Sequence, residues 1–112
     1  MKHVSVIFLS LTAALAVWAQ TPNTENGKKL FEQQACYQCH GWRGQGGLPG
    51  PRLAQTKLNL AGFRAILRDP PPSNMPPYRA ALLSDTQIAD IFAYIQSFPP
   101  PEPAANIPLL QN

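Results

Sequence analysis

The two cysteines of this 112-residue chain stand three positions apart, and a histidine follows the second one, in the segment Cys36-Tyr37-Gln38-Cys39-His40. Residues three apart lie on one face of a helical turn. Both sulfurs can therefore bond to one edge of a flat ligand while the next imidazole turns underneath it. The spacing C-x-x-C-H is that of c-type haem attachment. The motif predicts one haem c, covalently bound through Cys36 and Cys39, with His40 as an iron ligand.

Three other uses of the motif are open from the residues alone. A disulfide-exchange site requires alternating strands and helices, and the chain shows no strand pattern. A structural zinc site requires four ligands, whereas Cys36, Cys39 and His40 are the only usual sulfur or nitrogen donors after residue 19. A plain disulfide between the two cysteines is compatible with an oxidising compartment. The haem interpretation is favoured over these three.

A second axial ligand is predicted at Met75. Residues 20–112 contain one histidine, so a second histidine of the same chain is excluded as the sixth iron ligand. Pro76 biases Met75 toward extended backbone, which projects the thioether from the loop; the alternative is an ordinary core methionine. A histidine–methionine pair fills both axial positions of the iron, which favours electron transfer and argues against an enzyme.

Residues 1–19 have the pattern of a secretory signal peptide. A short basic start precedes an apolar stretch over residues 4–18, and Val17 and Ala19 are small enough for a cleavage site. The apolar stretch is shorter than the roughly 20 residues of a spanning helix. Cleavage is therefore favoured over an uncleaved membrane anchor, and we expect a periplasmic protein with no stable membrane insertion after cleavage.

The charge balance is mildly basic. Nine Lys and Arg residues oppose six Asp and Glu residues, a formal net charge of +3, and loss of Lys2 with the leader would lower it by one. No run of basic residues is longer than Lys28-Lys29. We therefore expect no nucleic-acid or membrane binding from net charge alone.

Two helices are predicted in the first half of the folded part. Residues 24–35 begin with Thr24 as a plausible N-cap. Residues 58–68 carry regularly spaced apolar side chains and must end before Pro70. Both have an apolar face suited to packing on a shared core.

A third helix is predicted from Ser84 to a point before Pro99. Ser84 and Gln87 have the spacing of a capping box. Apolar residues then recur in steps of three and four, as in a helix with one buried face; they are Ile88, Ile91, Phe92 and Ile95. The prediction is thus an all-α fold with three main helices.

The remaining segments read as loops and a tail. Residues 41–51 are rich in glycine, and residues 69–78 contain five prolines and are expected to be extended. Residues 99–112 carry four further prolines between 99 and 103 and one later, with little charge, which predicts a disordered proline-rich tail. The folded domain is therefore placed at residues 20–98.

Over residues 26–98 the chain resembles a class I cytochrome c of the small, secreted bacterial type. The haem motif, Met75-Pro76-Pro77 and the final amphipathic helix carry the resemblance. Further matching residues are Gly27, Phe31, Gly41, Gly50-Pro51-Arg52-Leu53, Leu83-Ser84-Asp85, Ile91, Tyr94 and Ile95. The fold expected is cytochrome c-like, with the faces of the haem covered by Leu53, Phe63, Leu67, Ile91 and Ile95 among others.

The resemblance also implies roles that spacing does not show. The carbonyl of Pro51 matches the group that accepts the second imidazole N–H of the haem-binding histidine, which orients the ring of His40. Gly27 and Phe31 match the face of the first helix that crosses the last helix near Ile91 and Tyr94.

The sequence departs from the best-known members in two places. Phe31 lies five residues before Cys36, where those members have four. They also hold a haem propionate with a tryptophan near the middle of the chain, and here Trp42 directly follows the motif. Arg52, Arg68 and Tyr78 are the candidate propionate partners, with solvated surface positions as the alternative for each.

These features predict a single-haem electron carrier that transfers one electron between secreted or membrane redox partners. It is expected to be a monomer or a subunit of a redox complex. The alternative is a haem-bearing subunit of a periplasmic dehydrogenase or oxidase, for which the proline-rich tail would serve as a docking or tethering segment. A less favoured alternative is a haem enzyme or sensor in which Met75 is displaced from the iron.

Overall fold

The computed structural model describes residues 20–111. The predicted signal peptide lies outside these described residues, so its cleavage stays a prediction. Within residues 20–111 the structure contains helices and no strand, which confirms the all-α fold class. Its α-helices are α1 (Thr24–Gln33), α2 (Cys36–His40), α3 (Leu60–Arg68) and α4 (Asp85–Gln96), followed by the short 3-10 helices η1 (Ala104–Asn106) and η2 (Pro108–Leu110). No helix in this part of the chain is long and apolar enough to cross a membrane.

The first predicted helix ends two residues earlier than expected. Helix α1 ends at Gln33, and Ala35 adopts a left-handed backbone with φ of 57° before α2 begins. The N-cap of α1 is Asn23, whose side chain accepts a hydrogen bond from the backbone N–H of Asn26 at 2.9 Å. The prediction of Thr24 as N-cap was therefore wrong by one residue. Both positions have a short polar side chain that can cap a helix, and in the structure it is the side chain of Asn23 that does so.

The other two predicted helices form at nearly the expected places. Helix α3 starts two residues later than predicted, with the side chain of Asn59 as its cap, and ends at Arg68, before Pro70. Helix α4 has the predicted capping box, in which Ser84 and Gln87 exchange hydrogen bonds between side chain and backbone.

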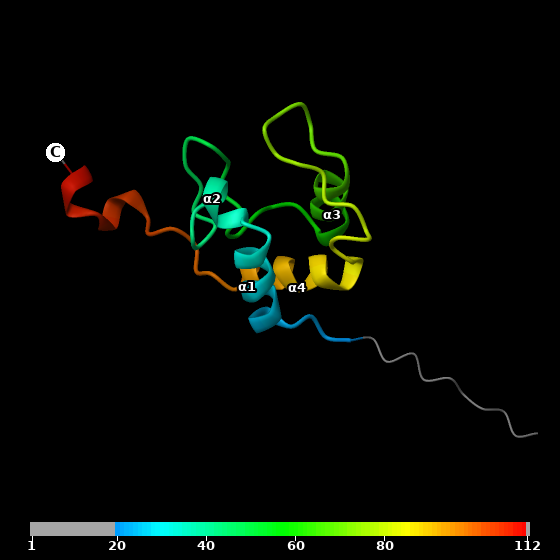
Figure 1. Cartoon of the computed structure of the whole chain (residues 1–112). Coiled ribbons are helices and arrows are strands. Elements are labelled where there is room, and N and C mark those ends of the chain that lie inside the picture. The colour runs from blue at the N-terminus through cyan, green and yellow to red at the C-terminus, as the bar shows by residue number, and fades with distance from the viewer. Residues whose placement is uncertain (1–19, 112) are drawn as a thin grey trace, which may run out of the picture.

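Helices α1 and α4 cross at close range (Figure 1). A Cβ placed on Gly27 would lie 2.0 Å from the carbonyl oxygen of Asp90 and 2.9 Å from Cβ of Tyr94, so only glycine permits this approach. Phe31 and Tyr94 meet edge to face with ring centroids 5.5 Å apart. The expected crossing of the first and last helices at Gly27 and Phe31 is confirmed.

The carboxylate of Asp90 fastens the same crossing from the polar side. Asp90 is buried on α4, and its two oxygens accept hydrogen bonds from the backbone N–H of Asn23 at 2.7 Å and from Nδ2 of Asn26 at 2.8 Å. A buried carboxylate is costly unless its oxygens find donors. Both donors come from the start of α1, so the pair of contacts fixes where that helix begins.

The core is built from α1, α3 and α4, with the last helix in the middle. Helix α3 packs on α4 through Phe63 and Phe92, whose ring centroids are 5.4 Å apart. The buried apolar residues form one cluster: Leu30, Phe31, Phe63, Leu67, Leu83, Ile88, Ile91, Tyr94 and Ile95. Leu53 is half-buried against this cluster, so all five residues predicted to cover the haem contribute to one core.

Within the described residues, the segment after α4 is anchored to the helices at its start. Nε2 of Gln55 donates to the carbonyl oxygens of Gln96 and Phe98, and Phe98 packs edge-on against Tyr94 with centroids 4.9 Å apart. Beyond these contacts the chain runs away from the helices to its C-terminus (Figure 1). The predicted disorder of this tail stays a prediction.

Replacing Gly27 by alanine should destabilise the protein by about 2 kcal/mol or more, because the new methyl group must push apart two helix backbones. The measurement is denaturant unfolding of the purified haem-loaded protein. Gly62→Ala is the matched control: a Cβ at this position in α3 meets its nearest atom at 3.4 Å, so the substitution should be neutral or stabilising. Equal losses in both variants would contradict the close crossing.

Asp85 joins the start of α4 to α3, and its effect on stability should depend on pH. Its oxygens lie 2.5 Å from Nη2 of Arg68 and 3.1 Å from Nη1 of Arg64. The hydrogen bond from Arg68, followed by the charges of both arginines, holds the pKa of the Asp85 carboxyl below its usual value. A lowered pKa means that ionisation stabilises the folded state above the ordinary carboxyl pKa, and that this contribution is lost as pH falls through the lowered value. Asp85→Asn should therefore be less stable than the parent at pH 7, with the difference vanishing in strong acid. A constant difference from pH 7 to pH 2 would refute this account.

Candidate haem-binding site

The cysteine–histidine motif forms the whole of the short helix α2. The left-handed Ala35 turns the chain into it, and Gly41, with φ of 81°, turns the chain out of it. Cys36 is half-buried against the core, whereas Cys39 is exposed, and no disulfide joins the two. Burial raises the pKa of the Cys36 thiol to about 11. Before haem is attached, this sulfur is therefore an uncharged thiol at neutral pH.

The imidazole of His40 is buried and held in one orientation. Its Nδ1 lies 2.7 Å from the carbonyl oxygen of Pro51. A carbonyl only accepts hydrogen bonds, so Nδ1 carries a proton, and in the neutral imidazole Nε2 then has the free lone pair. The hydrogen bond implied by the resemblance is present, and it prepares Nε2 as a metal ligand.

The glycine before Pro51 is required for this contact. A Cβ on Gly50 would lie 2.9 Å from both Cε1 and Nδ1 of His40. The glycine-rich loop also bonds to the motif directly, since the N–H of Gly46 donates to the carbonyl oxygen of His40 at 2.8 Å. The sequence marked Gly50 as part of a family pattern but did not show that its missing side chain makes room for the imidazole.

Met75 lies on the proline-rich loop between α3 and α4. It is half-buried and packs against the hydrophobic core, as Cys36 does. Its backbone N–H donates to Oγ of Ser73 at 3.2 Å. In Figure 1 this loop and α2 lie on the same side of the crossing between α1 and α4. The fold thus gathers the two predicted ligand segments on one side of the core.

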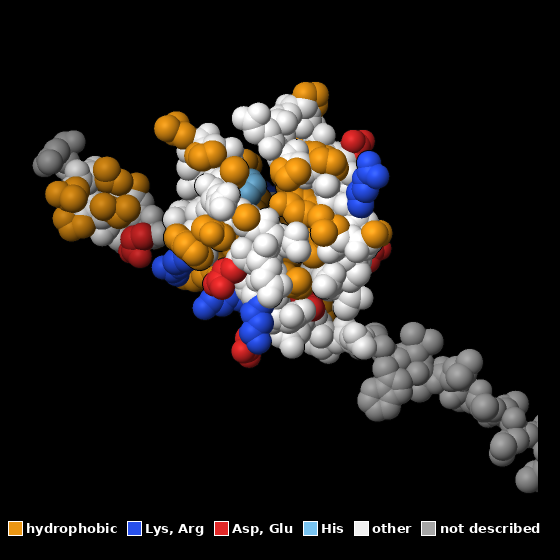
Figure 2. All heavy atoms as spheres, viewed as in Figure 1, with side chains coloured by type: hydrophobic (Ala, Val, Ile, Leu, Met, Phe, Trp, Pro, Cys, Tyr) orange, Lys and Arg blue, Asp and Glu red, His pale blue; other side chains and the backbone are white. Residues whose placement is uncertain are grey.

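A recess opens between α2 and the loop that carries Met75 (Figure 2). Figure 2 shows it bordered by hydrophobic side chains, with a histidine side chain in its wall. His40 is the only histidine among residues 20–111. An apolar recess with one oriented imidazole, two neighbouring thiols and a thioether on the same core is a donor set that fits haem c. The residues present therefore fit the group that the motif predicts.

The three candidate propionate partners have other bonds in the structure. Nε of Arg52 donates to the carbonyl oxygen of Ala54 at 3.0 Å. Arg68 binds two backbone carbonyls and Asp85. The hydroxyl of Tyr78 donates to the carbonyl oxygen of Gln34 at 3.1 Å. Arg68 and Tyr78 thus serve as links inside the protein, a role that sequence reasoning missed because most of their partners are backbone carbonyls of other segments.

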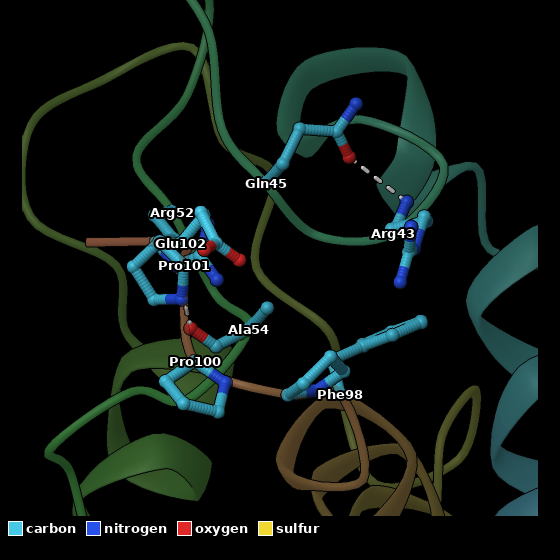
Figure 3. Close-up of a pocket in the computed structure, with 9 residues that line it drawn as sticks. Arg43, Gln45, Arg52, Ala54, Phe98, Pro100, Pro101 and Glu102 are labelled. Atoms are coloured by element: carbon cyan, nitrogen blue, oxygen red, sulfur yellow. Dashed lines mark hydrogen bonds between the residues drawn. The ribbon is translucent and has the colours of Figure 1, made fainter. Parts of the chain in front are cut away.

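A separate pocket of about 390 Å³ lies between the glycine-rich loop and the start of the tail (Figure 3). Arg43 places its guanidinium 5.3 Å from the centre of the Phe98 ring, and the backbone N–H of Arg43 donates to Gln45. None of the cysteines, His40 or Met75 lines this pocket.

Trp42, two residues after His40, is mostly exposed, and its ring stacks on that of Tyr37 with the ring centroids 3.8 Å apart.

Comparisons with known proteins identify the family of the chain. Residues 22–95 match the family described as cytochrome C oxidase, cbb3-type, subunit III. Cytochrome c-555 of Methylococcus capsulatus is 33% identical over 75 residues, which are 65% of this chain and 60% of that protein. The chain therefore spans less than two thirds of the length of this relative. No solved structure matches the chain.

The helices, the oriented histidine and the C-x-x-C-H spacing define a small class I cytochrome c. The family match covers more than half of the chain, so the chain belongs to this cytochrome c family. The family implies haem c as the cofactor and electron transfer as the general task.

Replacing Gly50 by alanine should displace the imidazole of His40 and destabilise the haem-loaded protein by about 1–3 kcal/mol, the cost of inserting a methyl group into a filled space. Unfolding by denaturant gives this cost, and the NMR signal of the His40 Nδ1 proton should exchange faster with solvent once the bond to Pro51 is strained. Gly47→Ala is the control, because a Cβ there meets its nearest atom at 3.6 Å. Similar behaviour of the two variants would count against the packing of Gly50 on His40.

Proposed function

We propose that this protein is a single-haem electron carrier, in which Cys36 and Cys39 form the two thioether bonds and His40 and Met75 bind the iron. The observation that supports this most directly is the buried imidazole of His40, whose Nδ1 donates to Pro51 and whose Nε2 is left with a free lone pair. When bound, the haem supplies a one-electron iron couple. The chain supplies the ligands, their orientation and the apolar surroundings.

The arrangement of ligands favours a carrier over an enzyme. His40 and Met75 would occupy both axial positions, which leaves no open position for a substrate. Stiff prolines flank Met75 in the sequence and limit how far its loop can swing. A haem peroxidase or a gas sensor would require Met75 to leave the iron.

We further propose that electrons pass to and from redox proteins of the periplasm. The predicted signal peptide supports this location. The alternative is a haem-bearing subunit of an oxidase or dehydrogenase complex. The description of the matching family as an oxidase subunit favours this alternative, as does the segment after Phe98, which leaves Leu109 and Leu110 exposed away from the core.

The test is to express the full-length gene in a bacterium with haem-attachment machinery and to record spectra of the purified protein. Haem should remain bound after denaturation in a pyridine haemochrome assay, and Cys36→Ser together with Cys39→Ser should abolish this retention. The ferric protein should show the weak iron–sulfur absorption band of methionine ligation, and Met75→Ala should lose it. The reduced protein should not bind carbon monoxide at neutral pH.

Each alternative has its own outcome in this experiment. No haem at all would overturn the carrier and return the two cysteines to a disulfide. Covalent haem without the sulfur band, with rapid carbon monoxide binding, would indicate an open iron site. Stable co-purification with an oxidase or dehydrogenase would favour the subunit over the free shuttle.

A further inference from the structure

The loop that carries Met75 is closed at its base by a group of hydrogen bonds. The backbone N–H of Tyr78 donates to the carbonyl oxygen of Leu67 at 2.7 Å. Nη1 of Arg68 donates to the carbonyl oxygens of Tyr78 at 2.6 Å and of Leu83 at 2.7 Å. Nη2 of the same guanidinium binds Oδ1 of Asp85 at 2.5 Å. Residues 69–77 are thus held as a closed loop between the end of α3 and the chain that leads to α4.

We propose that Arg68 is a positioning residue for the Met75 ligand, acting through the base of this loop. The inference rests on the proposed function, since it presumes that Met75 binds the haem iron. It adds a specific device to that function: the guanidinium of Arg68 keeps the loop closed, and the closed loop keeps the Met75 sulfur at the iron.

Arg68 is suited to this role because its planar fork reaches three acceptors at once. Its side chain is 24% exposed, against 40% for Arg64, one turn earlier on α3. Both arginines pair with Asp85, but only Arg68 also donates to the backbone of the loop. Charge-assisted hydrogen bonds are stronger than neutral ones. Removal of Arg68 would also leave the carbonyl of Leu83, a residue that is 1% exposed, without this donor.

The base of the loop is also tied to the haem motif. The hydroxyl of Tyr78 donates to the carbonyl oxygen of Gln34, two residues before Cys36. The carbonyl oxygen of Tyr78 therefore accepts a hydrogen bond from Arg68, while its hydroxyl donates to the junction between α1 and α2. This places the base of the Met75 loop in direct contact with the chain that presents the cysteines.

The loop itself transmits the position of its base. Five of its residues between 69 and 77 are prolines, whose φ angles are fixed near −65°. A stiff loop of this length moves as a unit when its base opens. When the base opens, the backbone angles of the loop should therefore not adjust to compensate, and Met75 should move away from the iron.

The experiment compares Arg68→Met with Arg64→Met in the haem-loaded protein. Both substitutions remove one arginine that pairs with Asp85, so both should lower stability, and only Arg68→Met opens the loop. Imidazole is the probe, because it binds ferric iron only where Met75 gives way. We expect Arg68→Met to bind imidazole at least about tenfold more tightly than the parent protein, the factor that corresponds to one lost hydrogen bond of a charged group. Its iron–sulfur band should weaken, while Arg64→Met keeps the parent affinity and the parent band.

Two further variants keep the test decisive if Arg68→Met folds poorly. Arg68→Lys keeps the charge beside Asp85 but cannot reach three acceptors with one planar group, so its imidazole affinity should lie between those of the parent and Arg68→Met. Tyr78→Phe removes only the bond to Gln34 and should raise imidazole affinity with little change in the unfolding midpoint.

The outcomes separate this inference from the proposed function. If the parent protein lacks the iron–sulfur band, Met75 is not the ligand and the proposed function fails. If the parent has the band, and Arg68→Met, Arg68→Lys and Tyr78→Phe all bind imidazole as the parent does, the carrier stands and the role of Arg68 is refuted. If Arg64→Met and Arg68→Met weaken the band equally, the effect belongs to general stability and the inference is likewise overturned.

Discussion

The close crossing of α1 and α4 is the contact on which the rest of this structure depends. It is possible because Gly27 has no side chain. A Cβ at this position would lie 2.0 Å from the carbonyl oxygen of Asp90. The approach brings Phe31 onto Tyr94 and lets the buried carboxylate of Asp90 take both of its hydrogen-bond donors from the start of α1. Since α2 follows α1 after two residues and α3 packs on α4, this crossing sets where the motif and the Met75 loop stand relative to each other.

The site is made by two loops of opposite character. The glycine-rich loop after α2 folds back on the motif, because Gly41, Gly44 and Gly46 have positive φ angles, and it delivers the carbonyl of Pro51 to His40. The proline-rich loop after α3 is stiff: Met75 packs against the core, and the hydrogen bonds that tie the loop to other segments are concentrated at its base. The glycine-rich loop thus contacts the imidazole of His40 with a backbone carbonyl. The proline-rich loop holds the thioether of Met75 because its own backbone is stiff.

Much of the fold was predictable from local pattern. The capping box at Ser84 and the apolar stripe of α4 depend on neighbours within one or two turns, so they are visible in the sequence. The cap of α1 was misplaced by one residue because Asn23 and Thr24 are both competent caps, and the choice is reinforced by Asp90, which is 67 positions from Asn23 along the chain. The end of α1 was placed two residues too late, at Ala35 instead of Gln33, because alanine favours helix and the left-handed backbone of Ala35 is imposed by the surroundings.

The sequence by itself determined the chemistry of this protein: the spacing of two cysteines and a histidine, the single methionine among residues 20–112, and the helical periods. These are properties of residues close together in the chain. Only the tertiary structure decided which tautomer His40 adopts, why position 50 must lack a side chain, and that Arg68 closes the Met75 loop instead of lying free at the surface. Each of these depends on a backbone carbonyl or a side chain that packing brings from another segment. The direction of a backbone carbonyl cannot be inferred from the pattern of side chains along a sequence.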